Sequence, residues 1–146
     1  MGAIMSGYIE TFRGVVYPWH CDHQGHMNTM HYVGMFDQAF WHHMSALGFT
    51  RDYMERNRGG FVDVRDTIEY KTEQGVGSLV IIESGLLKIG NTSMTALHRM
   101  RNIESGELAA TSEKISVYFD LEARSKAPFP DDLRPNMEAN IVEPDA

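Results

Sequence analysis

The stretch NTMHYVGMFDQAFWHHMSALG, residues 28–48, decides the fold of this 146-residue chain. Apolar residues recur in it every three and four positions, which is the pattern of an α-helix with a buried side. Asn28 or Thr29 can cap its start, and Gly48 follows its last apolar residue, where a helix-ending glycine is expected. Apolar side chains cover much of its circumference. The sequence therefore predicts a largely enclosed helix of roughly 18 residues and about 27 Å.

Strand-like segments lie on both sides of this helix. Residues 8–17 alternate β-branched and aromatic side chains, and Pro18 prevents a simple continuation of that strand. After a polar stretch that could hold a short helical turn, four segments of strand length follow: 61–73, 78–90, 91–102 and 108–120. The turns between them contain glycine, and their short length favours antiparallel pairing of consecutive strands. We expect an α+β fold with one antiparallel sheet on the helix, and oligomerisation through the uncovered face of the sheet.

Composition excludes several classes of protein. A net charge of −7 argues against a partner with a phosphate backbone, such as a nucleic acid. The single cysteine cannot form an internal disulfide, and no apolar run approaches the ~20 residues of a membrane span. The N-terminus lacks the basic and apolar regions of a secretory signal. We expect one cytoplasmic domain over residues 1–146, with 128–146 as a surface or flexible tail.

The segment HCDHQGHMNTMHY, residues 20–32, carries four of the seven histidines, the only cysteine and an aspartate. Metal binding by His20, His23 and His26 is one interpretation, but their spacing matches neither paired zinc ligands nor an HExxH helix. Cys21 as a nucleophile beside a histidine is a second one, although a single small cysteine is more often simply buried. Neither interpretation is favoured by the residues.

The third interpretation depends on Asp22, which lies shortly before the start of the helix. The first backbone N–H groups of a helix are unpaired and carry the positive end of its dipole. A carboxylate beside them could attack a carbonyl or activate water, while the N–H groups stabilise an oxyanion. Gly25 would let the backbone approach a ligand closely. The residues alone favour a simpler structural role, in which Asp22 caps a turn and Asn28 caps the helix.

The string WHCDHQGHMN, with Tyr32 and the following GMFDQA, resembles the hotdog-fold acyl-CoA thioesterases of the 4-hydroxybenzoyl-CoA thioesterase type. Their signature is roughly D-x-D-x-x-G, then a tyrosine, then an acidic residue on a helix. Asp22, Gly25, Tyr32 and Asp37 match this signature, and His20 replaces its first aspartate. A looser resemblance covers about residues 8–131.

This resemblance implies a hotdog fold, a curved antiparallel β-sheet wrapped around one long central α-helix. It also implies a homodimer that assembles into a homotetramer, and hydrolysis of an acyl-CoA thioester without a metal or any cofactor besides the CoA of the substrate. Asp22 would be the nucleophile or general base, and the backbone N–H of Thr29 would polarise the thioester carbonyl. No nucleic acid or membrane partner is expected.

The run from Asp22 to Asn28 also resembles the D-x-N-x-H-x-N-N motif of plant-type acyl-ACP thioesterases. That likeness makes His26 a second candidate catalytic residue, while Gln24 stands where the motif has an asparagine. The residues expected to contact the substrate are Gln24, Gly25, Asn28 and Tyr32. Some hotdog thioesterases use an acidic residue further along instead, for which Asp37, Glu55 and Asp63 are the candidates.

Two other functions stay open at this point, an acyl-thioester hydratase or dehydratase and a non-catalytic acyl-CoA-binding protein. The sequence does not identify the acyl group, although Trp19, Tyr32 and Phe61 are compatible with an aromatic or a quaternary-ammonium group. The histidines beyond this segment are expected to be structural: His42 and His43 at the surface or an interface, and His98 within a strand.

Overall fold

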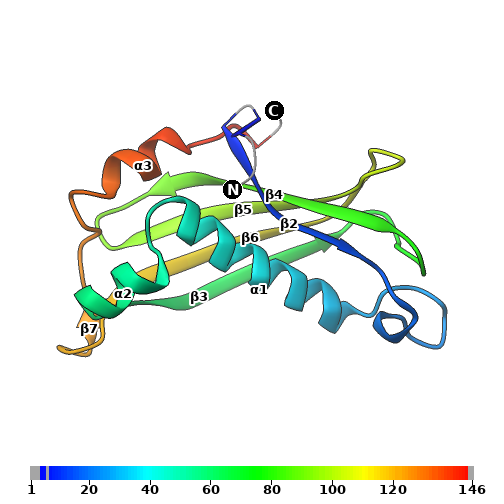
Figure 1. Cartoon of the computed structure of the whole chain (residues 1–146), viewed down its shortest axis with the longest axis horizontal. Helices are drawn as coiled ribbons and strands as arrows, with labels where there is room; N and C mark the ends of the chain where they lie inside the picture. Colours follow the sequence, from blue (N-terminus) through cyan, green and yellow to red (C-terminus); the bar gives the residue numbers. More distant parts are fainter. Residues whose placement is uncertain (1–3, 6, 145–146) are drawn as a thin grey trace.

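The computed structural model describes residues 4–5 and 7–144, in which one curved antiparallel sheet passes around a long helix (Figure 1). The strands are β1 (Ile4–Met5), β2 (Tyr8–Val15), β3 (Gly59–Tyr70), β4 (Leu79–Ile89), β5 (Ser93–Asn102), β6 (Leu108–Asp120) and β7 (Ser125–Lys126). The helices are the 3-10 turn η1 (Pro18–His20), α1 (Thr29–Ala46), α2 (Arg51–Asn57) and α3 (Arg134–Ala139). This arrangement confirms the predicted α+β class and hotdog fold. No helix in the described ranges is both long and apolar enough to cross a membrane.

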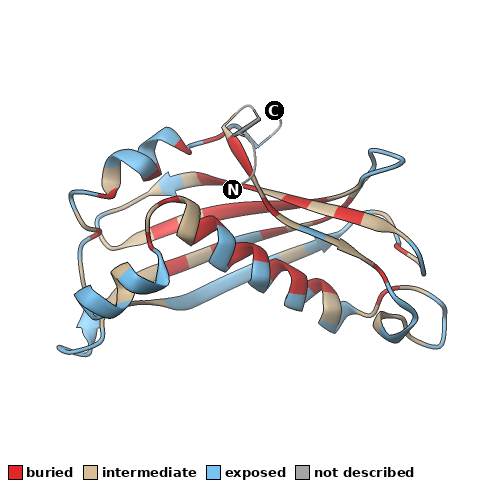
Figure 2. Cartoon of the chain, viewed as in Figure 1, coloured by how far each residue is buried: buried red, intermediate tan, exposed pale blue. Residues whose placement is uncertain are grey.

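Helix α1 begins and ends where the sequence predicts. The Oδ1 atom of Asn28 accepts a hydrogen bond from the Met30 N–H at 3.0 Å, and Gly48 follows the last turn with a φ of +107°. The helix packs mainly on β2 and β4, so its enclosure is one-sided (Figure 2). Its buried residues are Tyr32, Met35, Phe36, Ala39, Phe40, His43 and Met44. The opposite side, with Met30, Val33 and Trp41, is exposed because the sheet covers only one face.

The strand order is β1-β2-β4-β5-β6-β3, with β7 paired to β6. Consecutive pairing of the segments 61–73 and 78–90 was therefore a wrong prediction, since β3 pairs with β6 at the edge of the sheet. The link 71–78 is not a hairpin turn because it hydrogen-bonds elsewhere: the Gln74 carbonyl accepts the Met27 N–H at 2.7 Å. This link thereby joins the end of β3 to the loop that precedes α1.

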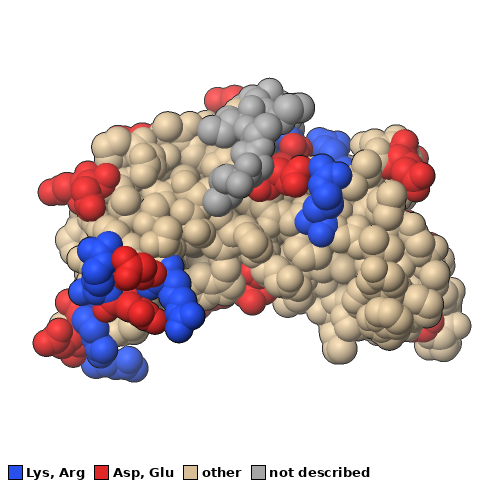
Figure 3. Space-filling view, viewed as in Figure 1, with Lys and Arg blue, Asp and Glu red and all other residues tan. Residues whose placement is uncertain are grey.

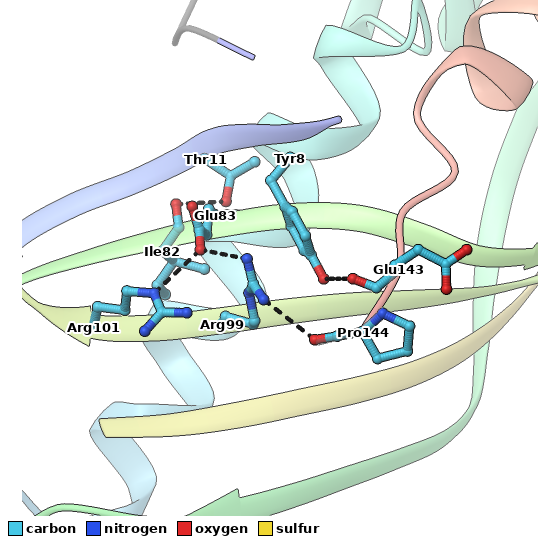
Figure 4. Close-up of polar contacts among 8 residues, drawn as sticks. All are labelled: Tyr8, Thr11, Ile82, Glu83, Arg99, Arg101, Glu143 and Pro144. Carbon is cyan, nitrogen blue, oxygen red and sulfur yellow. Dashed lines mark hydrogen bonds and ion pairs between the residues drawn. The ribbon is translucent and has the colours of Figure 1, made fainter. Parts of the chain in front are cut away.

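The C-terminal segment expected as a surface or flexible tail packs on the sheet. Met137 and Val142 are buried, and a parallel bridge joins Ile141 to Leu86. Figure 4 shows the polar contacts that fix the last residues: the Tyr8 hydroxyl donates to the Glu143 carbonyl at 2.9 Å, and Arg99 donates to the Pro144 carbonyl at 3.2 Å. The guanidinium of Arg99 also lies 3.6 Å from the centre of the Tyr8 ring. Residues 134–144, which include helix α3, are thus part of the folded domain.

Two fully buried histidines lie in the core between α1 and the sheet. His43 was expected at the surface, but it has no exposed area, because the 3.6-residue period places it on the buried side with Phe40 and Met44. Its Nε2 atom lies 2.6 Å from the Oδ1 of Asn140. His98 is structural as expected, with Nδ1 2.5 Å from the Ser84 hydroxyl. The two imidazole rings face each other edge to face, 5.5 Å apart.

Candidate functional site

The loop before α1 folds back on itself in a tight turn. The Asp22 N–H donates to the His26 carbonyl at 3.0 Å, and the Gly25 N–H donates to the Asp22 carbonyl at 3.0 Å. Gly25 has a φ of +83°, a conformation that side chains disfavour, so the turn requires a glycine there. Because the turn returns the chain to its start, the residues around Asp22 lie next to the first turn of α1.

A cavity of about 320 Å³ opens between this loop, the first turns of α1 and the end of β3. The sequence-predicted residues that line it are Asp22, Gln24, His26, Thr29 and Tyr32. Its other lining residues are Met27, Tyr70, Lys71, Thr72 and Glu73. The last four were not predicted, because only the pairing of β3 with β6 brings them beside the loop.

Asp22 and Thr29 supply complementary groups to this cavity. The Oδ1 atom of Asp22 accepts the Gln24 N–H at 2.9 Å, which fixes the carboxylate, while Oδ2 has no hydrogen-bond partner within residues 4–5 and 7–144. In the first turn of α1, Asn28 accepts the N–H groups of Met30 and His31. The Thr29 N–H has no acceptor in the described part of the chain and lies at the positive end of an 18-residue helix. The cavity is therefore lined by a residue that carries a carboxylate, Asp22, and by Thr29, whose backbone N–H is unpaired.

His26 also lines the cavity, and it pairs with a residue that the sequence did not indicate. Its Nε2 atom is 3.3 Å from the Oε2 of Glu73, in the link after β3. Both side chains are substantially exposed, so the pair contributes little to stability. Its consequence is geometric, because the contact with Glu73 orients the imidazole of His26.

Tyr32 forms the wall of the cavity on the α1 side. Its ring is buried and contacts the edge of the Tyr70 ring, with the ring centres 5.2 Å apart. Burial raises the pKa of the Tyr32 hydroxyl, and a backbone hydrogen bond from Gln74 opposes that rise. The Tyr32 hydroxyl is therefore protonated at neutral pH.

Gly25 and Asn28 do not line the cavity, although both were expected to contact a substrate. Gly25 occupies the turn of the loop, and the side chain of Asn28 is engaged in capping α1. The side chain of Asn28 therefore acts as a helix cap, as the structural interpretation predicts. One oxygen of Asp22 likewise caps its turn, by accepting the Gln24 N–H.

Replacing Asn28 by Ala is expected to lower the free energy of unfolding by about 1 kcal/mol, because the Met30 N–H loses its acceptor. Replacing it by Ser, which can also cap a helix, is expected to cost less than half as much. Urea unfolding followed by circular dichroism measures both changes. Equal losses for the two variants would show that the cap contributes nothing.

His20 and Cys21, in the same 20–32 segment, have local partners. The Nδ1 atom of His20 accepts the Tyr17 N–H at 2.9 Å, and the Cys21 sulfur lies 3.8 Å from the Tyr17 carbonyl oxygen. Cys21 does not line the cavity. Over the described ranges, no three His, Cys, Asp or Glu side chains converge as a metal site would require.

Solved structures show the same architecture. A hypothetical protein of Staphylococcus aureus, solved in complex with CoA, has a TM-score of 0.86 and 16% identity, over 96% of this chain and 87% of that one. A predicted thioesterase from Bacillus stearothermophilus has a TM-score of 0.77 and 27% identity, over 91% and 98% of the two chains. A 1,4-dihydroxy-2-naphthoyl-CoA thioesterase from Synechocystis has a TM-score of 0.75 and 16% identity, over 86% and 93%.

A search of curated proteins found no match to this chain. The sequence model of the Thioesterase-like superfamily, in contrast, matches residues 16–137, which include the loop, α1 and every strand from β3 to β7. That match confirms the resemblance drawn from the residues around Asp22 and, with it, the class of enzyme. The chain belongs to the Thioesterase-like superfamily of hotdog-fold thioester hydrolases.

Proposed function

We propose that this protein hydrolyses acyl-CoA thioesters to a free carboxylic acid and CoA in the cavity beside the N-terminus of α1. The observation that carries the proposal is that Asp22 and Thr29, whose backbone N–H is unpaired, line the same cavity. Ester-type hydrolysis needs a base or nucleophile on one side of a carbonyl and a donor to its oxygen. Membership of the Thioesterase-like superfamily indicates that the bond cleaved is a thioester.

In this mechanism the thioester carbonyl oxygen accepts a hydrogen bond from the Thr29 N–H. Asp22 either removes a proton from a water molecule that attacks the carbonyl carbon, or attacks that carbon itself to form an anhydride that water then opens. The negative charge that develops on the oxygen is stabilised by the Thr29 N–H and the positive end of the α1 dipole. Collapse of the tetrahedral intermediate breaks the C–S bond and releases the CoA thiolate.

His26 is the proposed source of the proton that the leaving thiolate takes up. Glu73 holds its imidazole with Nε2 3.3 Å from the carboxylate oxygen Oε2. The Tyr32 hydroxyl and the Gln24 side chain would border the acyl part of the substrate. No residue of this scheme requires a metal or a redox cofactor.

CoA as the thiol part of the substrate is supported by the structural neighbours. The Staphylococcus aureus protein was solved in complex with CoA, and the Synechocystis neighbour is a CoA thioesterase. Both are similar to this chain over most of their length.

The proposal is tested by offering the protein a panel of acyl-CoAs that includes a short enoyl-CoA. Hydrolysis releases free thiol, which a disulfide reagent reports, whereas hydration removes the absorbance of the conjugated double bond without releasing thiol. We expect thiol release from saturated and unsaturated substrates. Loss of conjugated absorbance alone would assign a hydratase instead, and tight binding without either signal would assign a non-catalytic acyl-CoA binder.

We also propose that the protein is a homodimer joined through β3. This strand has 12 residues, lies at the edge of the sheet, and has no second strand beside it among the described residues. Val62 and Val64 are exposed on it. A long exposed edge strand is a template for pairing with another copy, and pairing about a twofold axis satisfies both edges at once. Assembly of dimers into a tetramer remains a further prediction.

Replacing Val64 by Lys is expected to convert the dimer into a monomer, because charged side chains on an edge strand oppose pairing. Light scattering coupled to gel filtration measures the mass directly. The matched control is Val76→Lys, which places the same charge at an exposed valine in the link between β3 and β4. A mass unchanged by Val64→Lys would exclude β3 as the interface.

A further inference from the structure

The link between β3 and β4 contains a buried polar side chain that the proposed mechanism does not use. Gln74 is only 2% exposed, although the amide of a glutamine is costly to bury without hydrogen-bond partners. It does not line the Asp22 cavity, whereas its neighbours Thr72 and Glu73 do. Any contribution of Gln74 to the reaction therefore comes through the groups that it holds in place.

Both ends of the Gln74 amide bind groups at the ends of strands. Its Nε2 atom donates to the Thr72 carbonyl at 3.1 Å, just after β3, and its Oε1 atom accepts from the Asn102 Nδ2 at 3.0 Å, at the end of β5. Asn102 is fixed in turn, because its Oδ1 atom accepts the N–H groups of Glu104 and Ser105, both at 2.9 Å. These contacts hold the Gln74 side chain, and with it the backbone of the same residue, in one position.

The backbone of Gln74 holds two parts of the candidate site. Its N–H donates a hydrogen bond to the Tyr32 hydroxyl, and its carbonyl accepts the Met27 N–H at 2.7 Å. Beside the second bond, His26 and Gly75 form an antiparallel bridge between the loop before α1 and the link. Gln74 therefore connects both the loop and the first turns of α1 to the sheet.

The bond between Met27 and Gln74 also determines where Asp22 lies. Met27 pairs with Cys21 in a second antiparallel bridge, which places Asp22 beside the segment that Gln74 holds. A displacement of Gln74 would therefore move the Asp22 carboxylate relative to the Thr29 N–H. A misplacement of about 1 Å between reacting groups can slow a reaction by about 10²-fold.

Ion pairs contribute little to holding this end of the molecule together. On the face shown in Figure 3, most of the surface where α1 begins is neither basic nor acidic. The pair between His26 and Glu73 is exposed and therefore weak. Gln74 and Met27 are both buried, so water competes little for the bond between them. The loop is therefore held on the sheet mainly through Gln74.

From these contacts we infer that Gln74 is a positioning residue of the proposed reaction. Its side-chain amide fixes the peptide group that binds Met27, and this contact sets where Asp22 lies at the start of α1. The inference rests on the proposed function for the reaction that Gln74 affects. Because Gln74 does not line the cavity, its replacement slows the chemical step and leaves substrate binding largely intact.

Gln74→Met removes the amide but keeps a side chain of similar length. We expect kcat for thiol release to fall by about tenfold or more, and KM to change by less than about threefold. Asn102→Asp is expected to have a similar effect, because an oxygen replaces the Nδ2 donor while the Oδ1 acceptor remains. The matched control is Ser105→Ala, which removes the hydroxyl that accepts the Glu107 N–H in the same turn and should leave kcat within about twofold.

Two comparisons separate positioning from a general loss of stability. Val142→Ala shortens a buried side chain that does not line the cavity, and it should destabilise the fold without lowering kcat. In an Asp22→Asn background, Gln74→Met should slow hydrolysis by less than about twofold, because the carboxylate that Gln74 positions is already gone.

Hydrogen exchange of the Met27 amide tests the inference without catalysis. Gln74→Met is expected to speed this exchange by about tenfold or more, while Val142→Ala leaves it unchanged relative to the amides of β4. Equal Met27 exchange in wild type and Gln74→Met overturns the inference, as does an unchanged kcat or a full further loss in the Asp22→Asn background. If the wild type releases no thiol, the proposed function fails, and Met27 exchange alone then decides whether Gln74 holds the loop.

Discussion

Replacing Asp22 by Asn is expected to lower kcat for acyl-CoA hydrolysis by at least about 10²-fold. The amide can neither take a proton from water nor attack the thioester carbon. It can still accept the Gln24 N–H that now bonds to Oδ1, so the fold of the loop should persist. The measurement is the steady-state rate of free-thiol release from the best substrate of the acyl-CoA panel.

The control for this prediction is Asp37→Asn. Asp37 is exposed on α1 and is, with Glu55 and Asp63, one of the three candidates for an alternative catalytic carboxylate, but it does not line the cavity. Its replacement is expected to change kcat by less than about threefold, the effect of a surface charge. A large loss of kcat with Asp37→Asn and none with Asp22→Asn would identify Asp37, not Asp22, as the catalytic carboxylate.

Acidification is expected to destabilise the protein through its two buried histidines. Burial lowers the pKa of His43 to about 4, although its hydrogen bond to Asn140 opposes the change. Burial also lowers the pKa of His98, and the neighbouring His43 and Lys114 lower it further. Both histidines are therefore neutral in the folded protein at pH 5, while in the unfolded chain they bind protons below about pH 6.5.

The free energy of unfolding must then fall as the pH falls below about 6.5, since the unfolded state binds more protons. For His43 the loss between pH 7 and pH 5 is about 2 kcal/mol, and His98 adds to it in the same direction. The contribution of His43 stops changing below its folded pKa of about 4. Urea unfolding at pH 7, 6 and 5 measures this slope.

His43→Gln removes one of the two titrating groups and is expected to reduce the slope by about half, even if the variant is less stable overall. His42→Gln is the matched control, because His42 is the exposed neighbour on the same helix. A slope that His43→Gln leaves unchanged would show that other groups control the acid sensitivity.

Local patterns in the sequence predicted α1 well, because its cap, its periodicity and its final glycine all lie within residues 28–48. The same periodicity also places His43 on the buried side of the helix, although the sequence analysis expected it at the surface or an interface. The position of β3 in the sheet could not be predicted from such local patterns. Its pairing with β6 joins residues about 50 positions apart, which depends on the packing of the whole sheet.

The candidate site likewise contains residues that could be predicted from the sequence and residues that could not. Asp22, His26 and Thr29 were predicted from the resemblance to two thioesterase motifs, and one short turn brings the segment that carries them beside the start of α1. Tyr70 and Glu73 were not, since they reach the cavity only through the crossing of the link 71–78.

The central claim, that Asp22 cleaves a thioester in the cavity at the start of α1, is tested most directly by a single turnover. With the enzyme in excess over one acyl-CoA, free thiol appears at the rate of the chemical step, without contributions from product release or repeated binding. We predict that Asp22→Asn slows this step by at least about 10²-fold relative to wild type and to Asp37→Asn. Equal single-turnover rates for wild type and Asp22→Asn would contradict the account.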